Sequence, residues 1–282
     1  MYSFSVENNI NEILELTHSP SYDLVSIDGL LPPMATISTV QATNRDGSIL
    51  TNTRAEDRTI GITIAPKPPI ELNRQKLYRY FPLKKEVTLY FRNQNRNVKI
   101  NGIVESYDGS LFESKQTIAI NIRCLNPYFK NSNSSVQQMS QVIDNFEFPF
   151  AITEEGKEFS YIDKQLSQII DNTGDVDTGL IIEMEAMGTV VNPIIYDVVT
   201  RESFGLNITM QYGDVIRINT NVGNKKVELT RDGATTNVIN NITQDNTWFT
   251  LKTGENIFTY ACDEGEENLY INFYFSLMFE GV

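Results

Sequence analysis

Hydrophobic and polar residues alternate along several segments in the first half of the chain. In 117–125, the side chains of Ile118, Ile120, Ile122 and Cys124 fall on one face. A period of two residues is the pattern of a β-strand that is buried on one side. The same alternation predicts further strands at 58–65, 86–91 and 98–104. Turn-forming residues at 107–110 predict that the strands on either side of them form a hairpin.

One segment has helical periodicity instead. Between residues 71 and 81, apolar and long side chains recur at three- and four-residue spacing: Leu72, Lys76, Leu77, Tyr80 and Phe81. Prolines precede the segment at 68 and 69, and Pro82 follows it. Because proline is tolerated at helix ends and disrupts helix interiors, these positions mark the limits of one helix. We expect its apolar stripe to pack on the sheet.

The composition changes at 131–135, where the sequence reads Asn-Ser-Asn-Ser-Ser. Such a polar stretch is typical of a linker, and Ser135 is a candidate N-cap for a short helix through Gln141. The sequence therefore predicts a first domain at 1–130, a protease-sensitive linker at 131–142 and a second domain at 143–282. Short strands separated by Gly and Asp turns in the second half, with a long final strand at 267–279, favour an antiparallel β-sandwich.

Composition and charge narrow the class of protein. The chain has 282 residues, 40% of them hydrophobic and 21% charged, which fits two globular domains. Its net charge of -13 would repel a phosphate backbone or an anionic membrane surface, so neither partner is expected. Nothing approaches the roughly 18 apolar residues of a membrane span, and the first residues do not form a signal peptide. Cys124 and Cys262 lie far apart in the sequence, so we expect both to be buried free thiols and expect neither a zinc site nor a disulfide framework.

Candidate catalytic chemistry is sparse. His18 is the one histidine, and it precedes Ser19-Pro20, so we expect an exposed loop position. None of the motifs GxSxG, GxxxxGK[ST], HExxH or GxGxxG occurs. Carboxylate pairs that could suggest glycosidase chemistry lie in polar, turn-like stretches and are expected to be solvated: Glu154 with Glu155, and Glu264 with Glu266 and Glu267.

A calcium loop is also excluded by pattern. Asp171, Asp175 and Asp177 have suggestive spacing, but Val176 and Ile182 stand where an EF-hand requires Gly and Glu. A turn that precedes a strand is the better interpretation. We therefore predict no catalytic residue, no cofactor site and no metal site, and no enzymatic activity.

The order of short motifs along the chain resembles the distal tail protein family of long-tailed phages that infect Gram-positive bacteria. The first half carries Ile27-Asp28-Gly29-Leu30, Pro32-Pro33, Asp46-Gly47, Arg58 before alternating isoleucines, the helix, and Cys124-Leu125-Asn126-Pro127-Tyr128-Phe129. The second half carries Asp171-Asn172-Thr173-Gly174-Asp175, Asn192-Pro193, Gly213-Asp214, Trp248-Phe249 and Gly254-Glu255-Asn256. Each motif is weak alone, and together they span nearly the whole chain.

The resemblance implies a mostly β, two-domain fold. Its N-terminal part would be a sandwich-like or barrel-like ring-forming domain with one helix, and its C-terminal part a sandwich similar to galectins or carbohydrate-binding modules. It implies a structural subunit of the virion tail tip, assembled in the host cytoplasm. Six copies would form a ring that joins the tail tube to the host-recognition apparatus. The implied partners are further copies of the chain, the tail tube protein, the tail-tip or tail-associated lysin protein, and a receptor-binding protein.

Two sets of residues are candidates for binding. The stretch 49–58 reads as an exposed arm between strands, and its residues Thr51, Asn52, Thr53 and Arg54 are the candidate ring contact. The alternative function is a carbohydrate-binding adhesion module that contacts the host cell wall. For that alternative, Trp248 is the candidate sugar contact, because a tryptophan face stacks on sugar rings. Packing in the core is the competing interpretation of Trp248, next to Phe249 and Leu251 on the opposite strand face.

Overall fold

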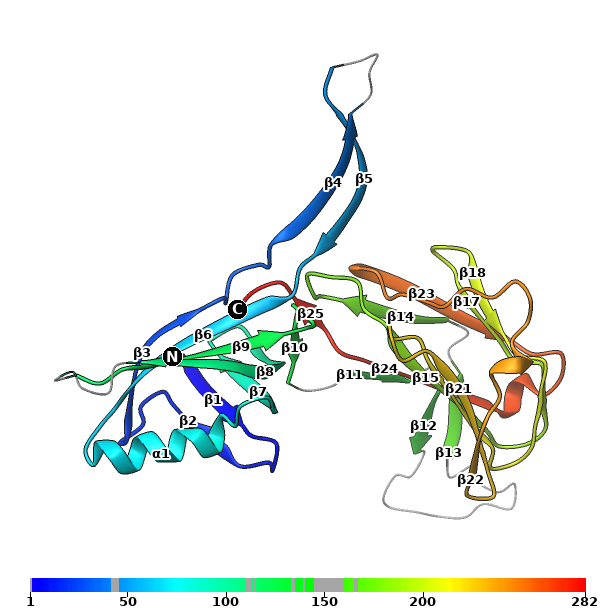
Figure 1. Ribbon diagram of the computed structural model, residues 1–282. Helices are drawn as coiled ribbons and strands as arrows, with labels where there is room; N and C mark the ends of the chain where they lie inside the picture. The colour runs from blue at the N-terminus through cyan, green and yellow to red at the C-terminus, as the bar shows by residue number, and fades with distance from the viewer. Residues whose placement is uncertain are drawn as a thin grey trace. The chain divides into compact units, whose positions relative to one another are not determined.

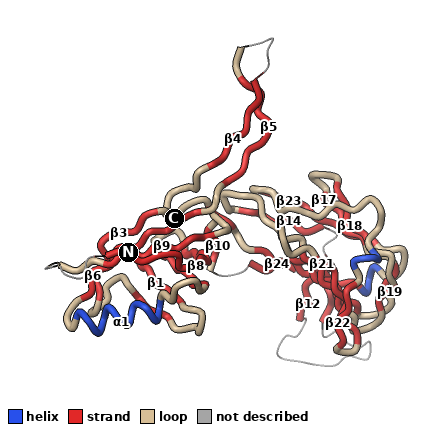
Figure 2. Tube along the Cα trace, in the orientation of Figure 1, coloured by secondary structure: helices blue, strands red, loops and turns tan. Residues whose placement is uncertain are grey.

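The chain folds into two compact units that are built mainly from antiparallel strands. The computed structural model describes residues 2–41, 46–109, 113, 115–132, 135–138, 140–144, 160–164 and 167–282. Unit 1 comprises Met1–Ser132 together with Met278–Val282, and unit 2 comprises Asn133–Leu277. Figure 2 shows that strands predominate in both units. None of the described helices is long and apolar enough to cross a membrane.

Unit 1 is organised around one large sheet, whose strand order is β2-β1-β7-β8-β9-β6-β3. Its strands are β1 (Ser3–Glu7), β2 (Ile13–Glu15), β3 (Tyr22–Asp28), β6 (Arg58–Pro66), β7 (Glu86–Arg92), β8 (Asn97–Gly109) and β9 (Ile118–Cys124). The predicted pairing is confirmed, because β8 pairs with β9 from Ile103↔Arg123 to Gly109↔Ile118. The predicted turn position is wrong, because Tyr107, Asp108 and Gly109 belong to β8 and are paired with β9. The described strands β2 and β3 end the order without pairing to each other, so the sheet does not close into a barrel.

The alternating residues of this sheet point into a common core. Ile60, Ile62, Ile120 and Ile122 are fully buried there, as the period of two predicts. Helix α1 (Ile70–Tyr80) covers this core, and Leu77 and the following Phe81 are fully buried. Leu72 and Lys76 depart from the expected stripe: both are exposed, and Asn73 is buried instead. Asn73 stays satisfied there because its amide donates to the carbonyl of Lys67 at 2.9 Å.

The end of the chain differs from the sequence expectation. A single strand at 267–279 was expected, but the segment forms a 3-10 turn η2 (Glu266–Asn268) and two strands, β24 (Leu269–Phe275) and β25 (Met278–Phe279). Phe275 pairs with Leu180 in unit 2, whereas Phe279 pairs with Phe129 of β10 (Phe129–Asn131) in unit 1. The strand is interrupted at Ser276 and Leu277, and residues 278–282 leave the expected second domain and join unit 1.

Unit 2 contains two larger sheets that face one another. The six-stranded sheet has the order β11-β24-β15-β20-β21-β22, and the four-stranded sheet has the order β14-β23-β17-β18. Their further strands are β11 (Ser135–Gln138), β14 (Ser167–Asn172), β15 (Leu180–Ala186), β17 (Ile194–Asp197), β18 (Glu202–Gly205), β20 (Val215–Asn219), β21 (Lys226–Arg231), β22 (Ala234–Asn237) and β23 (Gly254–Ala261). Smaller pairs are β12 (Ser140–Asp144) with β13 (Ser160–Lys164), and β16 (Val190–Val191) with β19 (Thr209–Met210). A 3-10 turn, η1 (Ile239–Asn241), follows β22.

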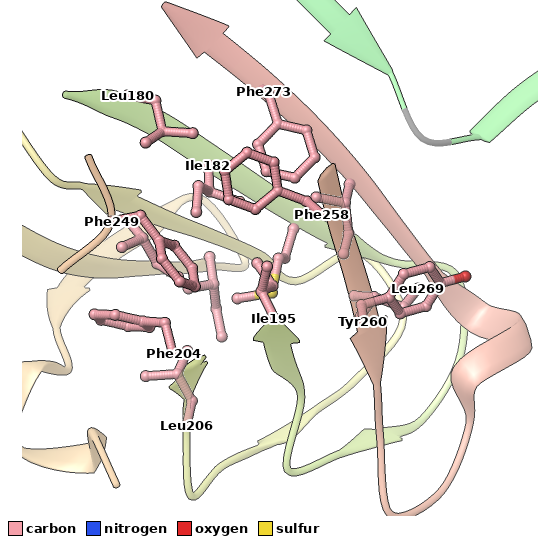
Figure 3. Packing of buried hydrophobic residues seen from close by; sticks show 14 of the residues in the cluster. Leu180, Ile182, Ile195, Phe204, Leu206, Phe249, Phe258, Tyr260, Leu269 and Phe273 are labelled. Atoms are coloured by element: carbon pink, nitrogen blue, oxygen red, sulfur yellow. The ribbon is translucent and has the colours of Figure 1, made fainter. Parts of the chain in front are cut away.

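Aromatic side chains from both sheets fill the space between them (Figure 3). Phe258 of the four-stranded sheet stacks on Phe273 of the six-stranded sheet, with ring centroids 5.1 Å apart. Phe249 packs edge-on against Phe258 at 5.5 Å. Such contacts add to the free energy of burying the rings, and they hold the two sheets together as a sandwich.

The expected linker is partly a strand. Ser135–Gln138 pairs with β24 along the edge of the six-stranded sheet, so the short helix proposed to begin at Ser135 is wrong. The backbone groups of this polar stretch are satisfied by strand pairing, which the polarity of its side chains does not reveal.

Candidate functional site

A two-stranded hairpin, here called the arm, is the most distinctive surface feature of unit 1. It consists of β4 (Ala35–Gln41) and β5 (Ser48–Ala55), which pair with each other and with no other described strand. Figure 1 shows it leaving the large sheet of unit 1 as a separate projection. The arm pairs along its length, from Ala35↔Ala55 to Gln41↔Ser48, with one register shift after Ser38.

The arm exposes large aliphatic side chains on an isolated ribbon. Ile37, Val40, Ile49 and Leu50 are 63%, 55%, 44% and 60% exposed. A two-stranded hairpin with no sheet or helix packed on it is marginally stable in water. Its open edges also offer unpaired N–H and C=O groups to another strand. Both properties are typical of a segment that is completed by a partner.

The candidate ring contact of the sequence analysis lies in this arm. Thr51, Asn52, Thr53 and Arg54 are all exposed, and they lie on β5 rather than in a loop between strands. The Thr51 hydroxyl donates to the carbonyl of Ser38 at 2.8 Å, which ties the two strands of the arm together. The structure thus brings these residues onto one projecting ribbon together with the exposed aliphatic side chains.

The root of the arm is held by hydrogen bonds. The backbone N–H of Glu56 donates to the carbonyl of Met34 at 2.8 Å, and the Thr36 hydroxyl donates to the Glu56 carboxylate. Asp57 forms an ion pair with Arg123 on β9. The arm therefore begins from a fixed point on the sheet of unit 1.

Trp248, the candidate sugar contact, is half-buried in unit 2. Its ring packs edge-on against Phe204, with centroids 5.1 Å apart, and the Lys225 ammonium lies 5.4 Å from the ring centroid. The expectation that Trp248 points away from the face of Phe249 and Leu251 is wrong, because residues 248–250 form no strand and Trp248 packs against the same core cluster as these two residues. These contacts favour a packing role for Trp248 over stacking on a sugar.

The remaining candidates of the sequence analysis that the structure describes lie at separate places. His18 is exposed and lines a cavity of about 560 Å³, in which Lys67 forms an ion pair with Asp23 at 2.7 Å. Asp177 accepts hydrogen bonds from Lys252 and from the backbone N–H of Thr253, both at 3.0 Å, which is the geometry of a turn cap. Glu154 and Glu155 lie outside the described residues. Within the residues that are described, no group of three or more His, Cys, Asp or Glu side chains could hold a metal ion.

Comparisons with known proteins match nearly the whole chain. A family model described as a phage tail protein RIFT-related domain matches residues 12–124, and a model described as the C-terminal domain of a siphovirus-type tail component matches residues 173–275. A search of curated proteins finds no match.

Two solved structures share the fold at low sequence identity. The Dit protein of phage SPP1, described as a paradigm of the hub adsorption apparatus in phages that infect Gram-positive bacteria, has a TM-score of 0.66 at 10% identity. That match covers 97% of this chain and 98% of the other. A chain of the phage P2 baseplate in its activated conformation has a TM-score of 0.51 at 9% identity, over 97% of this chain and 98% of the other.

Proposed function

The chain belongs to the siphophage distal tail protein family and is a structural component of the tail baseplate hub, and on this premise we propose that six copies form a ring joined through their arms. The ring links the tail tube to the host-recognition apparatus. The observation that carries this proposal is the arm itself, a paired ribbon with exposed aliphatic side chains and open edges.

The charge distribution supports assembly through unit 1. Of the 36 acidic and 23 basic residues, unit 2 holds 22 acidic and 8 basic ones, which leaves 14 acidic and 15 basic residues in unit 1. Nearly neutral units can approach one another, whereas units as acidic as unit 2 repel. We therefore assign the ring to unit 1 and an outer position to unit 2, whose sandwich would be the galectin-like part.

The geometry of the contact follows from the sheet edges. In a closed ring each subunit offers one surface and receives a different one, so every arm lies on its neighbour. Strand β3 is an edge of the large sheet and exposes Val25, which makes it a candidate acceptor for the neighbour's arm. Contacts of this kind are apolar and backbone-mediated. The ring should therefore persist or strengthen at higher salt, where repulsion between acidic surfaces is screened.

The proposed partner proteins follow from the position of the ring in the tail. One face of the ring would bind the tail tube protein, and the other the tail-tip or tail-associated lysin protein, with a receptor-binding protein as a further partner. Assembly would take place in the host cytoplasm before the virion is released.

The proposal is tested by removing the arm while keeping its root. Thr36 and Arg54 face each other in the hairpin, so an Asn-Gly turn can replace residues 37–53. None of the replaced residues belongs to the core of unit 1. We expect light scattering to give about six times 32.0 kDa for the full chain and the mass of one chain for the shortened variant.

A matched control changes exposed apolar residues of unit 2. Val222→Lys combined with Tyr212→Lys adds charge at two highly exposed positions outside unit 1, and this variant should still form the ring. If the variant without the arm still forms rings, the arm is not the contact between subunits. A full chain that stays monomeric at high concentration and high salt would overturn the ring.

A further inference from the structure

A buried arginine joins two backbone segments at the root of the arm. Arg58 is the first residue of β6 and is 5% exposed. Its guanidinium donates to the carbonyl of Gly29 at 2.9 Å and to the carbonyl of Glu280, and it lies 4.5 Å from the ring centroid of Phe129. Gly29 begins the connection from β3 into the arm, and Glu280 belongs to the final segment, residues 278–282. One side chain therefore holds both segments.

A second arginine repeats this arrangement. The Arg96 guanidinium donates to the carbonyl of Gly281 and lies 4.5 Å from the ring centroid of Phe279. The backbone N–H of Val282 then donates to the carbonyl of Leu30 at 3.2 Å. The final segment thus pairs with β10, accepts a hydrogen bond from Arg96 and donates one to the connection that leads into the arm.

Two glycines lie where backbone segments approach closely near the root of the arm. A Cβ on Gly29 would lie 2.2 Å from the carbonyl oxygen of Thr59, and Gly29 has φ +84°. A Cβ on Gly281 would lie 3.1 Å from the carbonyl oxygen of Leu30. Glycine permits the positive φ and the close approach of Gly29 to β6, and Gly281 lets the final segment lie close to the connection at Leu30.

The buried charge of Arg58 indicates that this residue fixes the positions of the two backbone segments that it bonds. Burying a guanidinium costs free energy unless all of its groups are bonded, and the Nε of Arg58 has no hydrogen-bond partner among the described residues. An apolar side chain of the same size would fill the space without that cost. The planar guanidinium of Arg58 holds the carbonyls of Gly29 and Glu280 at once, in a fixed geometry.

We propose that residues 278–282 act as a latch that fixes the root of the arm, with Arg58 and Arg96 as its positioning residues. This inference rests on the proposed function of the arm, which must leave the sheet in a defined direction to meet a neighbour. Loss of the latch frees the connection 29–34 and lets the arm swing. A swinging arm must be ordered at each contact, so ring formation is weakened.

Hydrogen exchange on the full chain tests the latch directly. The amide N–H groups of Val282 and Glu56 report on the root of the arm, because both donate to carbonyls of the connection 29–34. We expect Arg96→Met to raise their exchange rates at least about tenfold through local opening, with β8 and β9 unchanged. Arg58→Met should do the same, and Arg96→Lys should restore part of the protection. Arg92→Met is the control, because Arg92 is exposed on β7 and contacts neither segment.

The same measurement separates the latch from the ring. Arg96→Met can also be introduced into the variant in which Asn-Gly replaces residues 37–53. It should still raise the hydrogen exchange rates of Val282 and Glu56 there, although this variant forms no ring. Unchanged exchange at Val282 and Glu56 in both arginine variants would overturn the latch and leave the ring proposal intact. Faster exchange spread equally over β8 and β9 would also overturn it, because the arginines would then stabilise the whole unit. An arm-less ring would overturn the proposed function alone.

Discussion

Asp214 and Arg231 form a bidentate ion pair in unit 2. The Asp214 carboxylate is 2% exposed, and it accepts hydrogen bonds from Arg231 Nε at 2.8 Å and from the backbone N–H of Gln211 at 2.7 Å. Arg231 also donates to the carbonyl of Thr209 at 3.1 Å. The pair therefore fastens the turn before β20 to the end of β21. The Arg231 guanidinium beside it lowers the pKa of Asp214 below its ordinary value.

The first prediction concerns this pair and its pH dependence. Asp214→Asn keeps the shape of the side chain and removes its charge, so we expect a loss of about 1.5–3 kcal/mol in the free energy of unfolding near neutral pH. Because the folded-state pKa is lowered, the contribution is present above the unfolded-state pKa of Asp and is lost as the pH falls through the folded-state value. Denaturant unfolding at several pH values measures this. Asp232→Asn, at an exposed turn position, should change little. An equal loss in both variants would contradict the assignment.

The two thiols should differ in reactivity. Burial raises the pKa of Cys124 to about 12, and the nearby Arg58 offsets only part of this rise. Cys262 is half-buried. At pH 8 we expect a thiol-reactive disulfide reagent to modify Cys262 in the folded protein and Cys124 only after denaturation. The variant Cys262→Ser should then show no reactive thiol until it unfolds. Rapid labelling of Cys124 in that folded variant would show that the core of unit 1 opens.

A glycine in the large sheet tests the packing of unit 1. A Cβ on Gly102 would lie 2.5 Å from Ile122 Cγ2 and 2.8 Å from Cys124 Sγ. Gly102→Ala should therefore destabilise unit 1 by about 1–3 kcal/mol through overpacking. Gly61→Ala is the matched control on β6, where the nearest atom would be Asn121 Oδ1 at 3.5 Å. Thermal unfolding compares the two, and similar melting temperatures would contradict the packing argument.

Sequence periodicity located the strands that are buried on one face. Burial of one face enforces alternation of hydrophobic and polar residues. The alternating segments 117–125 and 58–65 therefore predicted β9 and β6 to within one or two residues of their observed bounds. The arm escaped recognition as a hairpin because both of its faces are exposed, and no alternation is enforced. A usable signal was present: β-branched residues at Thr36, Ile37, Thr39 and Val40 precede the turn pair Asp46-Gly47.

The latch could not be predicted from the sequence. Arg58 and Arg96 bond to carbonyl groups 222 and 185 residues away, and a backbone carbonyl has no side-chain signature. For the same reason the mostly polar segment Ser135–Gln138 was not predicted to be a strand, since its pairing with β24 depends on a segment far along the chain. The sequence did identify Thr51, Asn52, Thr53 and Arg54 as exposed, because polarity reports solvent contact directly.

The fourth prediction concerns unit 2 in isolation. A fragment of residues 133–277 retains β11 and omits the segment that belongs to unit 1, so it should fold as a monomer with one cooperative transition. A fragment of residues 143–282 lacks β11 and exposes the edge of β24, and it should be less stable and more prone to aggregate. Denaturant unfolding and light scattering compare the two fragments. Equal stability, or a 133–277 fragment that oligomerises like the full chain, would contradict the division.

Because the chain passes from one unit to the other twice, near residue 133 and again after Leu277, a protease that nicks it once near residue 133 does not release a free half. The downstream piece ends in five residues that complete the upstream fold through β10, Arg58 and Arg96. The two pieces should migrate together in gel filtration and part only in denaturant, as a noncovalent complementation pair. Residues 278–282 would then act as an intramolecular peptide ligand, and a synthetic copy of them should compete for the upstream piece.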